Sequence, residues 1–548
     1  MTIAGTAGSG REQRRSDPSM DRRSFLRSVA VGGAALAAGT LLDACGSPGA
    51  AQHSTAASST GSASGTPRRG GDLRVGLTGG GSTDTLNPFD GGISAIGTAR
   101  AQQLYQPLIQ LGNNAQLQYV LAEEIVPNGT TSNWIIKLRK GVSFHDGKPF
   151  GADDVIYTLR TILTQKLGGA TVLTPVDVKG LKKLDDLTVE VPMTSPFGSF
   201  PQQLASFWYF LYIAPDGWKQ ANPPNGTGPF KYKSFTPGQE SVFVRNDHYW
   251  KAGLPYLDSV TIQDYTDPTS VQNALVSKVI DCTGQLSGAQ MKSLQQSSGI
   301  VALPSRTGAI QPFTMRVDRA PFNDVNVRQA FRYIVDRPEL IAASLGGFGW
   351  VAADVTSPYD PDYDQGLHRQ QDIPLARHLL KKAGYDNDLK VSLDTSLGVS
   401  STALSMAQVF AQQASAAGVT VTINQISATT FFSNDYTKVP FAQIYYDYSP
   451  YLAQVAQTFL PTSPFPETHF NDPRYTNLYY EANKTRSPAV RKEIEHEMQQ
   501  IDFTQGGYII PCFVDSLDAY SSKLAGYETG KVGEPLGNFN FEDFWFRS

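Results

Sequence analysis

The sequence predicts an α/β protein in which helices cover the faces of mixed sheets. From residue 71 onward, short β-rich runs alternate with amphipathic helical stretches, and no fixed-period repeat is visible. The length of 548 residues indicates two to four units, or one large body of two lobes. Hydrophobic residues make up 40% of the chain, with 28 Phe and 24 Tyr, which is enough to bury large cores and excludes global disorder.

The first half of this body contains two clear strands and a clear helix. Residues 73–77 alternate in polarity as an opening strand should, and residues 134–138 form a second strand that ends at a turn. The helix follows the HDG sequence at 145–147, with Asp153 and Asp154 in its first turn, where the helix dipole favours acidic groups. Its apolar side chains recur on one face, at Val155, Ile156, Leu159, Ile162 and Leu163.

The second half contains four further helices and two strands. Asp324 can cap a helix whose inner face is Val327, Ala330, Phe331 and Ile334. A short helix over 375–383 ends at Gly384, and strands over 389–393 and 419–423 flank a helix over 402–416. Ser487 and Pro488 open a long helix. We expect the inner face of that helix to carry Val490, Ile494, Met498 and Ile501.

Charge and cysteine content exclude several classes of protein. The formal net charge of −4 gives no basic surface of the kind that binds nucleic acid. Three cysteines are too few for a disulfide scaffold or a cysteine-rich metal cluster. Cys282 and Cys512 could form one disulfide, or remain two separate buried thiols. The body has no apolar run of the ~20 residues that a membrane helix needs.

The N-terminal 44 residues resemble a twin-arginine lipoprotein signal. Arg22 and Arg23 precede a short apolar stretch rich in Gly and Ala, over 29–42, which is typical of a signal peptide rather than a spanning helix. Residues 42–45 read LDAC and resemble a lipobox, so Cys45 would carry the lipid. The alternative is an uncleaved hydrophobic anchor with an incidental cysteine. Met1 or Met20 could start translation, because Met20 lies just before the arginine pair.

Residues 45–70 predict a flexible tether between this anchor and the body. Ser, Ala, Gly, Thr and Pro dominate there, and such a chain has too little apolar surface to fold. The sequence therefore predicts a folded body attached by lipid to the extracytoplasmic face of the cell membrane.

Five segments of the body, taken in order, resemble family 5 of the extracellular solute-binding proteins. The longest reads LRKGVSFHDGKPF over 138–150 and is followed by ADDV over 152–155. The others read DTLNP over 84–88, GTGPF over 226–230, NDHYW over 246–250 and PFNDVNVRQA over 321–330, with a weaker AGY over 383–385. These proteins are the dipeptide-, oligopeptide- and nickel-binding components of ABC importers. Within the motifs, His145 and the glycines are expected to shape turns rather than contact a ligand.

The resemblance implies a type II periplasmic-binding-protein fold, with two lobes joined by two hinge crossings. It places lobe I at 71–312 and 506–548 and lobe II at 313–505. The crossings are expected within 311–317 and 507–514, where Pro312 and Pro511 could fix the chain path. A small solute, with a peptide as the leading candidate, would bind between the lobes and pass to ABC permease subunits. We expect a monomer that needs no cofactor or metal and is not an enzyme.

Candidate ligand contacts come from the resemblance and from the chemistry of peptides. Tyr446, Asp447 and Tyr448 resemble the segment in which peptide-binding relatives place an aspartate against the ligand's amino group. Asp447 could instead be a surface or capping residue. Arg316 could bind a ligand carboxylate or form a salt bridge between the lobes. Trp208 and Trp350 could wall the cleft, although a run of four aromatics around Trp208 is more often core.

Two other functions remain open at this point. The sequence contains no HExxH, GxSxG or Walker A motif, and its seven histidines are scattered, but a hydrolase with an unrecognised site is a second hypothesis. A third is a receptor that senses its ligand without importing it. The ligand could also be a nickel complex, a haem precursor or an oligosaccharide, since relatives bind these as well.

Overall fold

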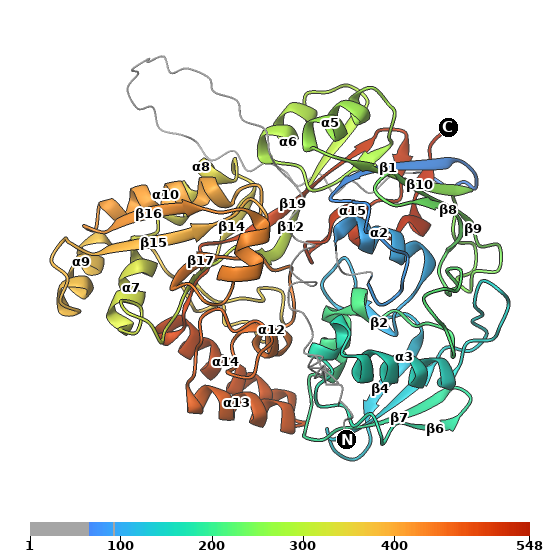
Figure 1. Cartoon of the computed structure of the whole chain (residues 1–548), viewed down its shortest axis with the longest axis horizontal. Coiled ribbons are helices and arrows are strands. Elements are labelled where there is room, and N and C mark those ends of the chain that lie inside the picture. The colour runs from blue at the N-terminus through green and yellow to red at the C-terminus, as the bar shows by residue number, and fades with distance from the viewer. Residues whose placement is uncertain (1–64, 91–93) are drawn as a thin grey trace, which may run out of the picture.

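The computed structural model describes residues 65–90 and 94–548. The predicted signal over 1–44, Cys45 and the tether up to residue 64 lie outside the described residues. The described chain forms three main sheets and two small strand pairs, with helices packed on them (Figure 1). This is the α/β class that the alternation of strands and helices predicts.

The largest sheet has eight strands and contains both ends of the body. Its strand order is β12-β19-β11-β1-β10-β9-β8, and β14 also pairs with β19. Helices α2, α5 and α6 pack against it. The strands are β1 (Asp72–Thr78), β8 (Phe230–Thr236), β9 (Glu240–Arg245), β10 (Ser259–Tyr265), β11 (Cys282–Thr283), β12 (Ile300–Ile310), β14 (Gly349–Val351) and β19 (Cys512–Ser521), and the helices are α2 (Ala95–Leu104), α5 (Pro268–Val276) and α6 (Gly288–Leu294).

A four-stranded sheet lies beside the largest one in the same part of the molecule. Its order is β4-β5-β7-β6, and α3 packs on β6 and β7 through the apolar face that the sequence predicts. We call these two sheets and their helices the first lobe, apart from the short strand β14, which pairs with the first residues of β19 but lies in the chain among the elements of the other lobe. The elements are β4 (Ala122–Pro127), β5 (Asn133–Leu138), β6 (Lys182–Asp185), β7 (Thr188–Pro192), α3 (Ala152–Gln165) and α4 (Phe200–Ser206), with the pair β2 (Ile109–Leu111) and β3 (Leu117–Tyr119).

The second lobe is built on a five-stranded sheet with the order β16-β15-β17-β13-β18. Phe313, Phe331, Phe410 and Phe441 pack ring against ring in its core. Its elements are β13 (Phe313–Met315), β15 (Lys390–Thr395), β16 (Thr420–Gln425), β17 (Phe441–Gln443), β18 (Tyr508–Ile509), α7 (Val325–Ile334), α8 (Arg337–Ser344), α9 (Ile373–Lys382), α10 (Ala403–Ser415), α12 (Tyr451–Thr458), α13 (Pro473–Lys484) and α14 (Pro488–Gln505).

The chain passes between the two lobes at two prolines. β12 belongs to the eight-stranded sheet and β13 to the five-stranded sheet, so the first passage is at Gln311-Pro312. β18 and β19 bracket the return passage at Ile510-Pro511. In Figure 1, β12 and β19 run side by side where the two lobes meet.

The predicted helices are confirmed, with one error on an inner face. Asp324 caps α7 through a bond from the Asn326 amide, and Ser487 caps α14 through the Val490 amide. Gly384, just beyond α9, has a φ of +93°, as a helix-ending glycine should. Val490 was expected to point inward but is 45% exposed, because the first turn of α14 extends beyond the core.

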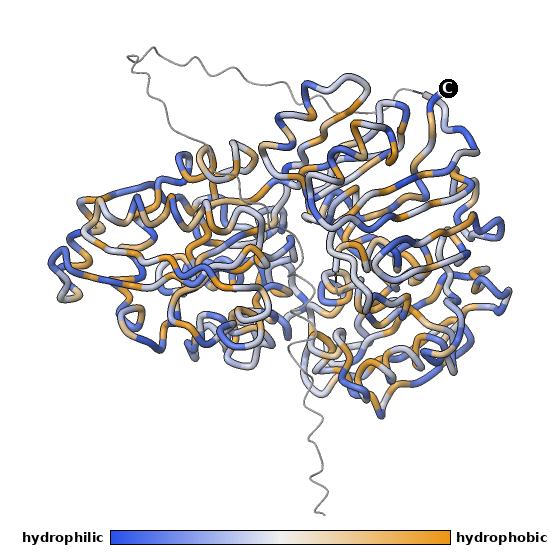
Figure 2. The backbone as a smooth tube through the Cα atoms, turned by 45° about the horizontal axis from the view of Figure 1, so that its top comes forward, coloured by the Kyte–Doolittle hydropathy of each residue, from blue (hydrophilic) through white to orange (hydrophobic). Residues whose placement is uncertain are grey.

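The polar surface of the chain follows its outer turns. Figure 2 shows hydrophilic residues at the outer turns of both lobes and hydrophobic residues along the strands and helices inside. Within the described ranges, none of the helices is both long enough and apolar enough to cross a bilayer.

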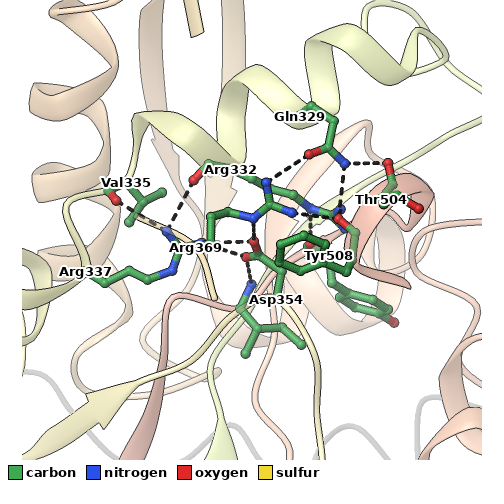
Figure 3. A network of polar contacts seen from close by, with 10 residues as sticks. Gln329, Arg332, Val335, Arg337, Asp354, Arg369, Thr504 and Tyr508 are labelled. Atoms are coloured by element: carbon green, nitrogen blue, oxygen red, sulfur yellow. Dashed lines mark hydrogen bonds and ion pairs between the residues drawn. The ribbon is translucent and has the colours of Figure 1, made fainter. Parts of the chain in front are cut away.

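A buried charge network ties the second lobe to the return passage. Asp354 is 1% exposed and forms ion pairs with Arg337 at 2.9 Å and Arg369 at 2.6 Å. Its Oδ1 also accepts a hydrogen bond from the backbone amide of Ile510, at the passage itself. Arg332 lies in the same network and donates to the carbonyl of Tyr508 (Figure 3). The Asp354 carboxylate therefore pairs with two buried guanidinium groups and also accepts a hydrogen bond from the backbone of the return passage.

Candidate functional site

The loop over 445–450 lies where the two lobes meet. It follows β17 of the second lobe and leads into α12. Tyr446 exchanges two backbone hydrogen bonds with Ile310, the last residue of β12, at 2.8 and 3.0 Å. The amide of Tyr448 donates to the carbonyl of Val532, which lies in a loop over 526–534 of the first lobe, at 2.7 Å. These bonds fix the 445–450 loop against both lobes.

Two carboxylates meet across this junction. Asp447 belongs to the 445–450 loop and Glu534 ends the 526–534 loop. A Cβ atom on Gly533, the neighbour of Glu534, would lie 2.4 Å from Asp447 Oδ1, so the aspartate packs directly against the Gly533 backbone. Neither acid forms an ion pair with a basic side chain in the part of the chain that the structure describes. The junction thus holds two close acids without a basic partner.

Burial makes these two acids electrostatically unfavourable as a charged pair. Both side chains are partly exposed, yet desolvation is the main influence on each. Burial raises the pKa of Asp447 to about 6, against a smaller lowering effect from the Tyr445 hydroxyl, which donates to Oδ1 at 3.2 Å. Burial and the negative charge of Asp447 raise the pKa of Glu534 well above its usual range.

Two tyrosines face the same acids from opposite lobes. Tyr209 comes from the short helical turn Trp208–Phe210 of the first lobe, and Tyr445 from the 445–450 loop. Burial, followed by the charges of Glu534 and Asp447, raises the pKa of both hydroxyls. Both tyrosines therefore stay neutral and offer hydroxyl and ring surfaces beside the two carboxylates. This set of four side chains is what we call the acidic site.

The lobes touch again away from the strand passages. The side chain of Asn483, at the end of α13, accepts hydrogen bonds from the amide and hydroxyl of Ser199 at 2.9 and 2.8 Å. Arg486 donates to the carbonyl of Gly129 at 2.9 Å. Helix α12 also contacts α4 across the junction. The lobes are therefore in contact both at the passages and at α13.

Tyr446 and Tyr448 flank Asp447, and the side chains of both tyrosines contact other residues of the protein. The Tyr446 hydroxyl hydrogen-bonds to buried Glu467, which also accepts from Tyr508 at 2.5 Å. Tyr448 is 3% exposed and packs edge-on against Tyr359, with ring centroids 5.9 Å apart. The structure thus brings Asp447 toward the first lobe and places the two neighbouring tyrosines in packing roles.

Arg316 and Trp208 lie elsewhere in the structure. The Arg316 guanidinium is paired with Asp318 at 2.6 Å and donates to the carbonyls of Thr437 and Lys438, all within the second lobe. Among the described residues it forms no salt bridge between the lobes, because its donors are occupied locally. Trp208 is 1% exposed and packs against Tyr212 in the core of the first lobe. We include neither residue in the acidic site.

Trp350 lies beside the strand passages. It belongs to β14, stacks on Phe513 of β19 with centroids 4.3 Å apart, and donates from Nε1 to the Thr307 carbonyl at 2.9 Å. The Arg306 guanidinium lies 4.4 Å from its ring centroid. Trp350 is partly exposed, and it packs against Tyr359, whose ring also packs against Tyr448. We do not include it in the acidic site.

The remaining polar motifs have structural roles. His145 Nε2 lies 3.1 Å from the Gly228 carbonyl, and burial lowers the pKa of the ring to about 4, so it is a neutral turn residue as expected. Cys282 and Cys512 are two separate buried thiols. A cavity of about 330 Å³ lies in the first lobe, lined by Glu528 and Asp543 among others, but no residue of the second lobe lines it.

Three members of the acidic site were not predicted from the sequence. Glu534 stands alone before Pro535, and its proximity to Asp447 arises only from tertiary folding. Tyr209 lies in the aromatic run around Trp208, but only Trp208 was considered there as a wall of the cleft. Tyr445 precedes the segment on which the resemblance rests. What distinguishes the two acids is their burial without an ion pair among the described residues, and this is a property of the folded chain.

Sequence comparison decides the family of this chain. The sequence model of the bacterial extracellular solute-binding proteins, family 5, matches residues 116–476, which is more than half of the chain. The chain belongs to this family. Its members include the glutathione-binding protein GsiB of Pectobacterium atrosepticum, which is 27% identical over 484 residues, covering 84% of this chain and 92% of the relative.

Solved structures of the family share the fold. The ABC transporter substrate-binding protein CtaP of Listeria monocytogenes has a TM-score of 0.77 and 21% identity, covering 88% of this chain and all of CtaP. The periplasmic binding protein DppA of Helicobacter pylori, in complex with the peptide STSA, has a TM-score of 0.73 and 19% identity, covering 88% of this chain and 99% of DppA. The two-lobed type II fold is therefore confirmed.

Family membership also settles the general function. The chain is an extracytoplasmic solute-binding protein of an ABC importer, which delivers a small solute to the permease, and it is not an enzyme. The hydrolase hypothesis is thereby excluded.

Proposed function

We propose that this protein captures a solute with a free ammonium group, most simply a peptide, and that the acidic site binds this group. The proposal rests on the pair of carboxylates, Asp447 and Glu534, which meet at the lobe junction and form no ion pair with a basic side chain among the described residues. A cation between them would offset their repulsion and their desolvation together. The N-terminus of a peptide supplies such a cation, and the rings of Tyr209 and Tyr445 offer a surface for the adjoining chain.

We further propose that capture closes the two lobes on the solute. The proposed hinge is at the two proline passages, so the proposed first lobe comprises 71–312 with 511–548 and the second lobe 313–510. The boundary expected at 506 shifts because β18 pairs with β13 of the second lobe. Asp447 comes from one proposed lobe and Glu534 from the other, so an ammonium bound to both favours the closed form. We expect the protein to work as a monomer, since this mechanism needs no second copy.

Calorimetric titration with matched peptides tests the proposed ligand. The panel contains short peptides with a free N-terminus, the same peptides N-acetylated, and glutathione, which the name of the GsiB relatives suggests. We expect free peptides to bind and acetylation to weaken binding by at least about 30-fold, since removing one partner of a buried charge pair costs roughly 2 kcal/mol or more. Equal affinity for free and acetylated peptides would contradict the proposal. Native mass spectrometry of the purified protein would identify any solute that it carries from the cell.

We also propose that Cys45 carries a lipid that holds the protein on the outer face of the cell membrane. The support is the arginine pair, the apolar stretch and the LDAC sequence at 42–45. Changing Cys45→Ala should move the protein from the membrane fraction to the soluble fraction and leave solute binding intact, because the acidic site lies about 400 residues away in the chain. Fractionation and immunoblotting measure this. A Cys45→Ala protein that stays in the membrane fraction would contradict lipidation, and Ser47→Ala is the matched control.

A further inference from the structure

Three carboxylates gather within the second lobe, apart from the acidic site. Asp360 and Asp362 belong to a loop over 357–366, and Glu495 belongs to α14, which packs beneath that loop. Each offers a carboxylate oxygen, and these three oxygens all lie within 4.8 Å of one another. The sequence in the loop reads DPDYD over 360–364, so acids recur at alternate positions.

Glu495 is the most buried of the three carboxylates, and its charge is not compensated by an ion pair within the described part of the chain. It is 3% exposed, and its carboxylate has neither a hydrogen bond nor an ion pair among the residues that the structure describes. A buried carboxylate without a partner is costly to maintain. Instead of a donor, it faces Asp360 and Asp362. Burial, and then these two negative charges, raise the pKa of Glu495 to about 9.

Other residues of the protein hold the three acids in place. Gln499, one turn after Glu495 on the same face of α14, accepts from the Asp364 amide at 2.7 Å and donates to the Asp362 carbonyl at 2.9 Å. Asp360 accepts from the Tyr451 amide at 2.9 Å and from the Asp362 amide at 3.0 Å. Each Asp360 oxygen thus accepts one bond and keeps a lone pair. Among the described residues, the side-chain oxygens of Asp362 and Glu495 accept no hydrogen bond and are open to a cation.

One basic side chain lies near this cluster. Arg491, one turn before Glu495, lowers the pKa of both Asp360 and Glu495 by its charge, but it forms no ion pair with either. Its own donors include Nη2, which bonds to the Thr485 carbonyl at 3.1 Å. Three ionised carboxylates and one guanidinium group together carry two net negative charges, which one divalent cation would balance.

We propose that Asp360, Asp362 and Glu495 bind a calcium ion. Carboxylate oxygens from three side chains are hard ligands, which suit Ca²⁺ or Mg²⁺ rather than zinc or copper. Calcium is the better fit, because it accepts six to eight oxygens in irregular arrangements, whereas Mg²⁺ demands a near-ideal octahedron and keeps most of its water. The Asp362 carbonyl is already used by Gln499, so water would complete the shell.

Such an ion would stabilise the region around the acidic site. The 357–366 loop carries Tyr359, whose ring packs against Tyr448 at 5.9 Å and Trp350 at 6.0 Å. Asp360 also holds the amide of Tyr451, the first residue of α12, directly after the 445–450 loop. The ion would therefore join α14 to the start of α12 and to the loop that supports Asp447.

Thermal unfolding of chelator-treated protein, titrated with CaCl₂, tests this proposal. We expect the melting temperature to rise with a midpoint between about 10⁻⁴ and 10⁻³ M, the range of extracellular calcium modules. Glu495→Gln should move the midpoint upward by at least about tenfold, because even the loss of a residue that supports a metal ligand costs 10- to 100-fold in affinity. Glu493→Gln, on the exposed face of the same helix, should leave it unchanged.

A second readout does not depend on stability. Tb³⁺, which replaces Ca²⁺ in oxygen sites, should give tyrosine-sensitised luminescence that added Ca²⁺ removes, and Glu495→Gln should reduce this signal. No saturable response of the wild-type protein up to about 10 mM CaCl₂, or equal responses of wild type and Glu495→Gln, would overturn the proposal. A response to Mg²⁺ at the same or lower concentration would overturn the assignment to calcium.

Discussion

Replacing Asp447 with asparagine should weaken binding of a free-amine peptide by about 30- to 4,000-fold. The substitution keeps the shape of the side chain and removes the charge that we propose pairs with the ligand ammonium. Truncating one partner of a buried charge pair typically costs roughly 2–5 kcal/mol, and each ~1.4 kcal/mol is tenfold in affinity. Titration calorimetry with the same peptide measures the loss. Asp386→Asn, which changes an exposed aspartate on the outer surface of the second lobe, is the control and should bind as wild type does.

Two further measurements, with the N-acetylated peptide and at lower pH, show whether Asp447 pairs with the ligand ammonium itself. Asp447→Asn should have little further effect on the affinity for the N-acetylated peptide, because the ammonium is already missing. For wild type, affinity for the free peptide should fall as the pH drops below about 6, since burial raises the pKa of Asp447 to about that value and a protonated acid has no charge to offer. Equal losses for free and acetylated peptide would mean that Asp447 supports the loop without meeting the amine. Unchanged tight binding would remove Asp447 from the site.

Replacing Asp354 with asparagine should lower the free energy of unfolding by about 3–5 kcal/mol. Asp354 is the one carboxylate shared by Arg337 and Arg369, and all three side chains are about 1% exposed or less. Asparagine removes the charge and leaves two guanidinium groups buried beside each other. It also tolerates the backbone at this position, where φ is +62°, so the measured loss reports the charge rather than backbone strain.

Chemical denaturation followed by tryptophan fluorescence measures the loss, with Asp386→Asn as the control. Asp386 pairs with Lys381 at 3.5 Å on the surface, and such exposed pairs contribute little to stability. A loss of under about 1 kcal/mol for Asp354→Asn would show that water or a local shift compensates the two arginines.

The local pattern of the sequence was sufficient to predict most of the helices of the fold. The apolar spacing of α3 and α7 and the capping residues Asp324 and Ser487 are local features, and each predicted its helix. Val490 shows the limit of the pattern, because spacing gives the face of a helix but not how far the core extends along it. Trp208 shows a related limit. A run of aromatic residues has the same sequence pattern in a buried core and in the wall of a cleft, so the pattern does not tell which of the two it forms.

The site was only partly predictable because its residues meet through the fold. Asp447 was accessible through its resemblance to a known segment. Glu534 lies far from it in sequence, and only the packing of the 526–534 loop against the 445–450 loop brings the two acids together. The salt bridge between the lobes considered for Arg316 is replaced by a local one, because Asp318, two residues away, pairs with its guanidinium. Burial and pairing are tertiary properties that residue type alone does not reveal.

The position of β19 has a consequence for how the protein is made. This strand lies inside the eight-stranded sheet, between β12 and β11, although about 200 residues separate it from β12 in the chain. At about 5–20 residues per second, β12 waits on the order of ten seconds or more after synthesis before its partner exists. During that interval the second lobe can already fold, while the first lobe exposes unpaired strand edges that invite aggregation. We therefore expect the nascent first lobe to depend on chaperones until β19 leaves the ribosome.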